Sequence, residues 1–97
     1  MNIVWTGEAE SSFEKIIDYI RTWFTEKEVD RFILDTYEII KIIQTHPKLF
    51  PISKIRKFRS TRKAVIHPHS TLFYRISSSN QITLIAFWDN RQNPKHL

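Results

Sequence analysis

Basic side chains crowd into one short segment of this chain. Six of them lie between residues 54 and 63, namely Lys54, Arg56, Lys57, Arg59, Arg62 and Lys63. From Lys41 to Arg91 the chain contains a single acid, Asp89, so this positive charge has little internal compensation. A one-sided positive field attracts polyanions such as nucleic acid, or acidic proteins. The segment is therefore a candidate binding surface.

Arg75 is a candidate for phosphate recognition because it lies within an apolar stretch. Tyr74 and Ile76 flank it, and successive side chains of a strand point to opposite faces of a sheet. The Arg75 side chain is therefore predicted to leave the face opposite to its apolar neighbours. There its planar guanidinium could contact a phosphate through two hydrogen bonds. The alternative is a structural ion pair with Asp89 across the sheet.

Two histidines and a tryptophan complete the candidates. His67 and His69 stand two residues apart, which can place two imidazoles on one face of a strand. Pro68 between them favours a turn and no third ligand is close, so we expect no metal site and no cofactor. Either imidazole could act as a base near neutral pH, although exposed turn histidines are the simpler interpretation. Trp88, at the end of an apolar stretch, could stack on a nucleobase or belong to the core.

The N-terminal half predicts a strand followed by two helices. Residues 2–6 are short, apolar and β-prone. Apolar residues then recur at helical spacing from residue 9 to 24 and again from 29 to 43. Thr6 and Thr25 are the predicted N-caps, and Thr25 with Glu28 has the Thr-x-x-Glu spacing of a capping box. A short break at this point predicts an antiparallel helical hairpin.

The C-terminal half predicts a loop and three strands. His46-Pro47 ends the second helix, and Leu49–Thr61 has no clear period. The predicted strands are Arg62–His67, Leu72–Ile76 and Ile82–Trp88, followed by a polar tail over residues 89–97. Consecutive strands joined by short turns should pair antiparallel.

Together these elements predict one α+β domain over residues 1–97, in the order β-α-α-β-β-β. The helical hairpin is expected to pack on one face of a small twisted, mainly antiparallel sheet, because that face is the large apolar surface available. The bases of residues 54–75 should then gather on and around the other face. The chain has no cysteine, no apolar run long enough to span a membrane and no signal peptide pattern. A cytoplasmic location is expected.

The order of elements and several short pieces of sequence resemble the RelE/ParE family of toxins from type II toxin–antitoxin pairs. In chain order the pieces are Ile3-Val4-Trp5-Thr6 with Glu8-Ala9, His46-Pro47 with Phe50-Pro51, Arg62-Lys63, Leu72-Phe73-Tyr74-Arg75-Ile76, and Ile82–Trp88 with Asp89-Asn90-Arg91-Gln92-Asn93-Pro94. The resemblance covers most of the chain. It implies the fold described above, and a partner antitoxin whose extended or helical segment wraps the toxin and masks its basic surface.

Two activities occur among proteins that this chain resembles. RelE-like members enter the ribosomal A site and cut mRNA by metal-free attack of a ribose 2′-hydroxyl on the adjacent phosphate. ParE-like members bind DNA gyrase and stall it. Cleavage requires groups that take and give a proton, and cations that stabilise the phosphorane. Family ribonucleases carry a tyrosine or a His-Tyr pair after the last strand, where this chain has Trp88-Asp89-Asn90-Arg91.

The resemblance implies a set of site residues. The catalytic candidates are Arg62, Arg75 and Arg91, and the candidates for nucleic-acid binding are Lys54, Lys57, Arg59, Lys63 and Trp88. The basic patch favours ribosome-dependent mRNA cleavage by a metal-independent endoribonuclease, with ribosome and mRNA as partners. The alternatives are a ParE-like gyrase inhibitor without catalytic activity, and a non-toxic basic domain that binds nucleic acid or an acidic partner.

Overall fold

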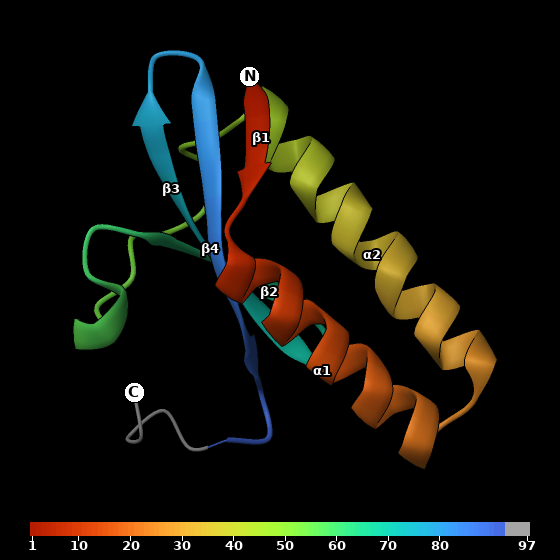
Figure 1. Cartoon of the computed structure of the whole chain (residues 1–97). Helices are drawn as coiled ribbons and strands as arrows, with labels where there is room; N and C mark the ends of the chain where they lie inside the picture. The colour runs from red at the N-terminus through yellow and green to blue at the C-terminus, as the bar shows by residue number, and fades with distance from the viewer. Residues whose placement is uncertain (93–97) are drawn as a thin grey trace.

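The computed structural model describes residues 1–92 of the 97-residue chain. Its elements are β1 (Asn2–Trp5), α1 (Gly7–Trp23), α2 (Glu26–Thr45), the 3₁₀ turn η1 (Arg56–Phe58), β2 (Arg62–Ile66), β3 (Ser70–Ser78) and β4 (Gln81–Asp89). The predicted α+β class and the order β-α-α-β-β-β are confirmed (Figure 1). The predicted polar tail begins one residue later than expected, because Asp89 belongs to β4. Its last part, Asn93–Leu97, lies outside the described residues.

Both helices begin after a threonine whose hydroxyl accepts a hydrogen bond from an amide of the first turn, which has no carbonyl partner within the helix. The Thr6 hydroxyl accepts a hydrogen bond from the Ala9 amide at 3.0 Å, and the Thr25 hydroxyl accepts one from the Glu28 amide at 3.2 Å. The two predicted N-caps are therefore confirmed. α2 ends at Thr45, just before the proline-containing segment, and the two helices run antiparallel (Figure 1).

The four strands form one mixed sheet in the order β1-β4-β3-β2. β2, β3 and β4 pair antiparallel as a meander, as predicted. β1 pairs parallel with β4, with Trp5 opposite Leu84. β4 is consequently an inner strand and is bonded on both sides.

The helical hairpin covers one face of this sheet and buries the main core (Figure 1). The helices contribute residues that are at most 5% exposed, including Ile16, Ile20, Phe32, Ile40 and Ile43. The strands contribute residues that are at most 2% exposed, namely Ala64, Ile66, Leu72, Tyr74, Ile82 and Leu84. Burial of these apolar side chains is what holds the helices on the sheet.

The opposite face carries a second, smaller core. A β-bulge sets it up, because Phe73 pairs with Ala86 while Tyr74 pairs with Leu84 and leaves Ile85 as the extra residue. The bulge turns both Ile85 and Ala86 toward the face away from the helices, where Phe58 of η1 stacks on Phe73 with ring centroids 4.1 Å apart. The segment that was expected to be a loop therefore contains a 3₁₀ turn and covers part of this face.

Two side chains of the sheet tie down the chain that leaves α2. The buried Tyr74 hydroxyl donates to the Pro47 carbonyl at 2.7 Å. The Arg62 guanidinium donates to the carbonyls of Phe50 at 2.7 Å and Lys48 at 3.2 Å. Burial raises the pKa of Tyr74 to about 12, although the nearby Arg62 charge opposes the rise.

The Tyr74 hydrogen bond is expected to contribute measurably to stability. Tyr74→Phe keeps the ring but leaves the Pro47 carbonyl without its partner, which should lower the free energy of unfolding by about 1–2 kcal/mol. Urea unfolding followed by circular dichroism measures the change. Tyr37→Phe is the matched control, since the Tyr37 side chain is 53% exposed. Equal losses in the two variants would contradict this role.

Stability should also depend on alkaline pH through Tyr74. Folding raises its pKa from 10.0 to about 12, so the unfolded chain loses this proton first as the pH rises. The contribution of Tyr74 is therefore complete below pH 10 and declines as the pH approaches 12. The difference in unfolding free energy between the wild type and Tyr74→Phe should shrink over that range. A constant difference would rule out this coupling.

Candidate functional site

Arg62 lies on the side of the sheet that faces the helices. It is paired in register with Tyr74, and its guanidinium is occupied by the carbonyls of Lys48 and Phe50. The expectation that the bases of residues 54–75 gather on and around the other face is therefore wrong for Arg62. The reason is the alternation of side chains along β2, which directs Arg62 and its neighbour Lys63 to opposite faces.

Arg75 leaves the sheet on the face opposite to Tyr74, as predicted, and it is exposed. Its guanidinium lies 3.4 Å from the carbonyls of Arg59 and Ser60, which is long for a hydrogen bond. The alternative ion pair with Asp89 does not form, because Asp89 lies opposite Ser70 at the start of β3, far along the strand from Arg75, and it pairs with Arg91 instead.

Arg62 and Arg75 both contribute to one pocket at the beginning of β2. They line a pocket of about 180 Å³ together with Ile52, Ser60, Thr61, Tyr74 and Ile76. Besides the two arginines, Tyr74 is the one lining side chain that can exchange a proton, and burial raises its pKa to about 12. This pocket therefore combines positive charge with no group that exchanges a proton near neutral pH.

Arg91 is held apart from the other two arginines. Its Nε donates to both carboxylate oxygens of Asp89 at 3.0 Å, and its guanidinium carbon lies 3.2 Å from the centroid of the Tyr19 ring on α1. The hydrogen bonding of the Arg91 guanidinium to the Asp89 carboxylate is the main reason why the pKa of Arg91 is raised. The three catalytic candidates are thus not brought into one site.

Lys63 and Trp88 share a groove on the face away from the helices. The groove has a volume of about 210 Å³ and is lined by Ile55, Lys63, Val65, Thr71, Phe73, Trp88, Asn90 and Gln92. Lys63 is its single charged side chain. The Trp88 Nε1 atom is buried and has no hydrogen-bond partner among residues 1–92. The groove is therefore mostly apolar, with one cation and three polar side chains.

The remaining basic candidates lie on the segment that carries η1. Lys54, Lys57 and Arg59 are exposed. The Lys57 ammonium lies 5.8 Å from the centroid of the Phe58 ring. Lys57 also lines a neighbouring pocket of about 380 Å³ that contains Lys15, Arg91 and the acids Glu8 and Asp89. The positive charge is thus spread over the surface and partly balanced.

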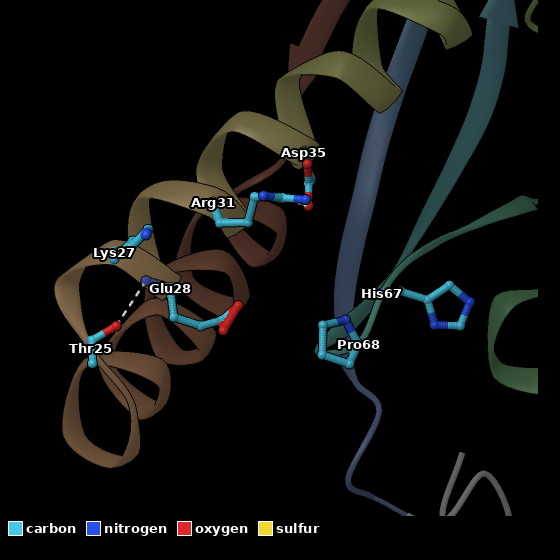
Figure 2. A pocket seen from close by; sticks show the side chains of 7 residues that line it. All are labelled: Thr25, Lys27, Glu28, Arg31, Asp35, His67 and Pro68. Atoms are coloured by element: carbon cyan, nitrogen blue, oxygen red, sulfur yellow. Dashed lines mark hydrogen bonds and ion pairs between the residues drawn. The ribbon is translucent and has the colours of Figure 1, made fainter.

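Another pocket, of about 330 Å³, lies between the start of α2 and the β2–β3 turn (Figure 2). It mixes both charges and is lined by Thr25, Lys27, Glu28, Arg31, Asp35, His67 and Pro68. Arg31 and Asp35 pair with each other at 3.5 Å, and the His67 side chain points away from α2 (Figure 2). The lining thus mixes both charges and does not define a site for one kind of ligand.

The two histidines of the turn differ in their surroundings. His67 is exposed, as expected. His69 is only 9% exposed, so the prediction of an exposed turn histidine is wrong for it. Its ring packs against Phe24 and Phe32, because the end of the helical hairpin reaches over the turn. Its Nε2 atom lies 3.9 Å from a Glu28 carboxylate oxygen.

Within residues 1–92 there is no cluster of three or more histidines, aspartates or glutamates arranged to hold a metal ion. No helix of this part of the chain is long and apolar enough to cross a membrane.

Sequence reasoning missed the apolar lining of the groove that contains Lys63 and Trp88. Val65 is 43% exposed and shares a face of β2 with Lys63, two residues earlier. The alternation of side chains along β2 was a signal that could have identified it. Phe73 and Ile55 could not be found in this way, because the bulge and the η1 segment bring them together.

Solved structures share this fold. The chain superposes on a chain of the chromosomal ParDE toxin–antitoxin system from P. aeruginosa with a TM-score of 0.73 and 15% identity, covering 92% of this chain and 95% of the other. For the YoeB/ParE toxin from Agrobacterium tumefaciens the TM-score is 0.63 at 14% identity, covering 92% and 98%. For the heterotetrameric YoeB–YefM toxin–antitoxin complex from Staphylococcus aureus it is 0.59 at 18% identity, covering 90% and 93%. At these identities the likeness concerns the fold.

No curated protein matches the sequence. The sequence does match the family described as "ParE toxin of type II toxin-antitoxin system, parDE" over residues 3–94. Because this match spans nearly the whole chain, the protein belongs to the ParE toxin family of type II toxin–antitoxin systems.

Proposed function

We propose that this toxin stops growth by binding a protein target, DNA gyrase, and stalling it, and that it does so without cleaving RNA. Gyrase inhibition is the activity that the resemblance to ParE-like members implies. The proposal reverses the preference for mRNA cleavage that the basic patch alone favours. It places the toxin in the cytoplasm, where bacterial DNA lies.

The observation that carries the proposal is the state of the three candidate catalytic arginines. Arg62 is occupied by backbone carbonyls of the segment after α2, and Arg91 by Asp89 and Tyr19. RNA cleavage needs several cations around one phosphate, together with groups that exchange protons. In the pocket of Arg62 and Arg75 the side chain available for proton exchange is Tyr74. Its hydroxyl is bonded to the Pro47 carbonyl and its pKa is raised to about 12, so it is poorly suited to proton exchange near neutral pH.

The groove that contains Lys63 and Trp88 supports contact with a protein. Its lining is largely apolar, with a tryptophan and a single cation. Fully buried interface centres are depleted of charge and enriched in aromatic residues, and tryptophan is prominent among the side chains that dominate binding energy. Together with the exposed Val65, this groove is the best candidate for the target-binding surface.

A cognate antitoxin is the second partner that we propose. Two of the similar structures belong to toxin–antitoxin assemblies, the ParDE system and the YoeB–YefM complex. Residues 41–97 hold eleven bases against one acid, and much of this charge is exposed on the η1 segment. An acidic segment of an antitoxin would be attracted to it.

Expression of the toxin without its antitoxin is expected to arrest growth with mRNA intact. The purified protein should inhibit supercoiling by gyrase, because the proposed mechanism needs only binding. Mapping mRNA 5′ ends after induction, beside a gel assay of gyrase supercoiling, measures both outcomes. Ribosome-phased cuts in mRNA with unaffected gyrase would refute the proposal in favour of an endoribonuclease.

A matched pair of substitutions separates the two pockets. Val65→Glu places a charge in the groove of Lys63 and Trp88, and it should weaken gyrase binding about tenfold or more, which corresponds to about 1.4 kcal/mol. Ile52→Glu makes the same change at an apolar side chain that is 60% exposed, in the pocket of Arg62 and Arg75. It should leave gyrase binding close to that of the wild type.

Surface plasmon resonance with immobilised gyrase compares the two variants, and circular dichroism checks that both are folded. The opposite pattern, in which Ile52→Glu abolishes toxicity and Val65→Glu does not, would assign the working site to the two arginines instead.

A further inference from the structure

A pocket between the two helices lies on the opposite side of the sheet from the groove of Lys63 and Trp88. It has a volume of about 490 Å³ and is lined by Trp5, Glu10, Phe13, Glu14 and Tyr37. These residues come from the end of β1, the first half of α1 and the middle of α2. The function proposed above makes no use of this pocket.

Three aromatic rings form the walls of the pocket. The Trp5 ring centroid lies 5.4 Å from that of Phe13 and 6.3 Å from that of Tyr37. Behind this surface Trp5 stacks on Phe87, and Phe13 packs against Phe32. The walls are therefore held in place by the core, while the Tyr37 side chain is 53% exposed and accessible to a ligand.

Two carboxylates stand at the rim. Glu10 and Glu14 are four residues apart on α1, so they lie one above the other on one side of the helix. Neither forms an ion pair with any residue of the described range 1–92, whereas Asp18 and Glu26 of the same hairpin both pair with Arg21. The pocket lining contains no base. Its charge is therefore uncompensated and negative.

We propose that this pocket receives an arginine side chain of a partner protein, and that the partner is the antitoxin. The identity of the partner rests on the function proposed above, and the chemistry of the pocket does not. A guanidinium stacks on aromatic faces and makes strong paired hydrogen bonds with carboxylates. An apolar side chain would fill the same walls but would bury part of Glu10 and Glu14 without a partner, which is unfavourable.

The charge distribution of the whole chain agrees with this assignment. Residues 1–40 hold nine acids against four bases, and residues 41–97 hold one acid against eleven bases. A partner that wraps both sides must therefore present basic side chains to the helical hairpin and acidic ones to the η1 segment. The pocket of Trp5 and Tyr37 is a place on the hairpin side where a basic side chain would meet both negative charge and an aromatic surface.

Binding is tested with the intact protein and small probes. The probe is Nα-acetyl-arginine amide, and the control probe is the neutral isostere Nα-acetyl-citrulline amide. Titration is followed by heteronuclear NMR, which resolves the indole N–H of Trp5. We expect saturable shifts at Trp5 with the arginine probe, and about tenfold weaker binding of the citrulline probe. Equal shifts with both probes, or none with either, would overturn the proposal.

Variants assign the binding to this pocket. The double variant Glu10→Gln with Glu14→Gln removes the charge, and Tyr37→Ala removes an exposed wall. Each should weaken binding of the arginine probe about tenfold. Glu38→Gln is the control, since Glu38 is an exposed acid next to Tyr37 in sequence that does not line the pocket. If Glu38→Gln weakened binding of the arginine probe as much as the double variant does, the effect would be one of net charge, and the proposed site would be contradicted.

The outcome is separable from that of the proposed function. Growth arrest and gyrase inhibition by the unaltered chain are measured without the probe. If those assays fail while the arginine probe still binds, the proposed toxin mechanism is rejected and the proposed arginine site is retained. Failure of the probe titration with gyrase inhibition intact would remove the pocket alone.

Discussion

The structure depends on β3 and β4 being buried on both faces. Leu72, Phe73 and Tyr74 are consecutive in β3, and none is more than 1% exposed. A strand sends neighbouring side chains to opposite faces, so a core on one side of the sheet cannot bury all three. The helical hairpin covers Leu72 and Tyr74, and Phe58 of η1 covers Phe73. In this chain of 97 residues, the face away from the helices is covered by a short segment that contributes a single buried aromatic side chain, Phe58.

This constraint determines where the basic residues go. The segment that carries Phe58 also carries Lys54, Lys57 and Arg59, so closing the second core lays these exposed bases over the edge of that face. The segment is fastened at its start by Arg62 and Tyr74, which bond the carbonyls of Phe50 and Pro47. Arg62, a catalytic candidate in the sequence, therefore helps to hold this segment against the sheet. Loss of these side-chain hydrogen bonds is unfavourable, because the Phe50 and Pro47 carbonyls would be left without these partners.

The same arrangement gives the molecule three surfaces of different chemistry. The η1 side is positive, the groove of Lys63 and Trp88 is mostly apolar, and the pocket between the helices combines aromatic walls with two carboxylates. The function that we propose needs distinct surfaces, one for the target and one for the antitoxin. We base the proposal of a binding function on this separation, because catalysis would require the charged groups to converge on one point.

The sequence by itself determined the fold class, the order of the elements and both helix N-caps. These follow from local rules, namely apolar periodicity and the hydroxyl of a threonine at the start of each helix, which act over a few residues. It also determined the direction of Arg75, since alternation along a strand is local. Tertiary structure alone decided that β1 pairs with β4, that a bulge at Ile85 redirects the end of β4, and that Arg62 and Arg91 are occupied. Each of these outcomes joins residues that are distant in the chain or depends on a one-residue shift in register, and local patterns carry no information about such pairings.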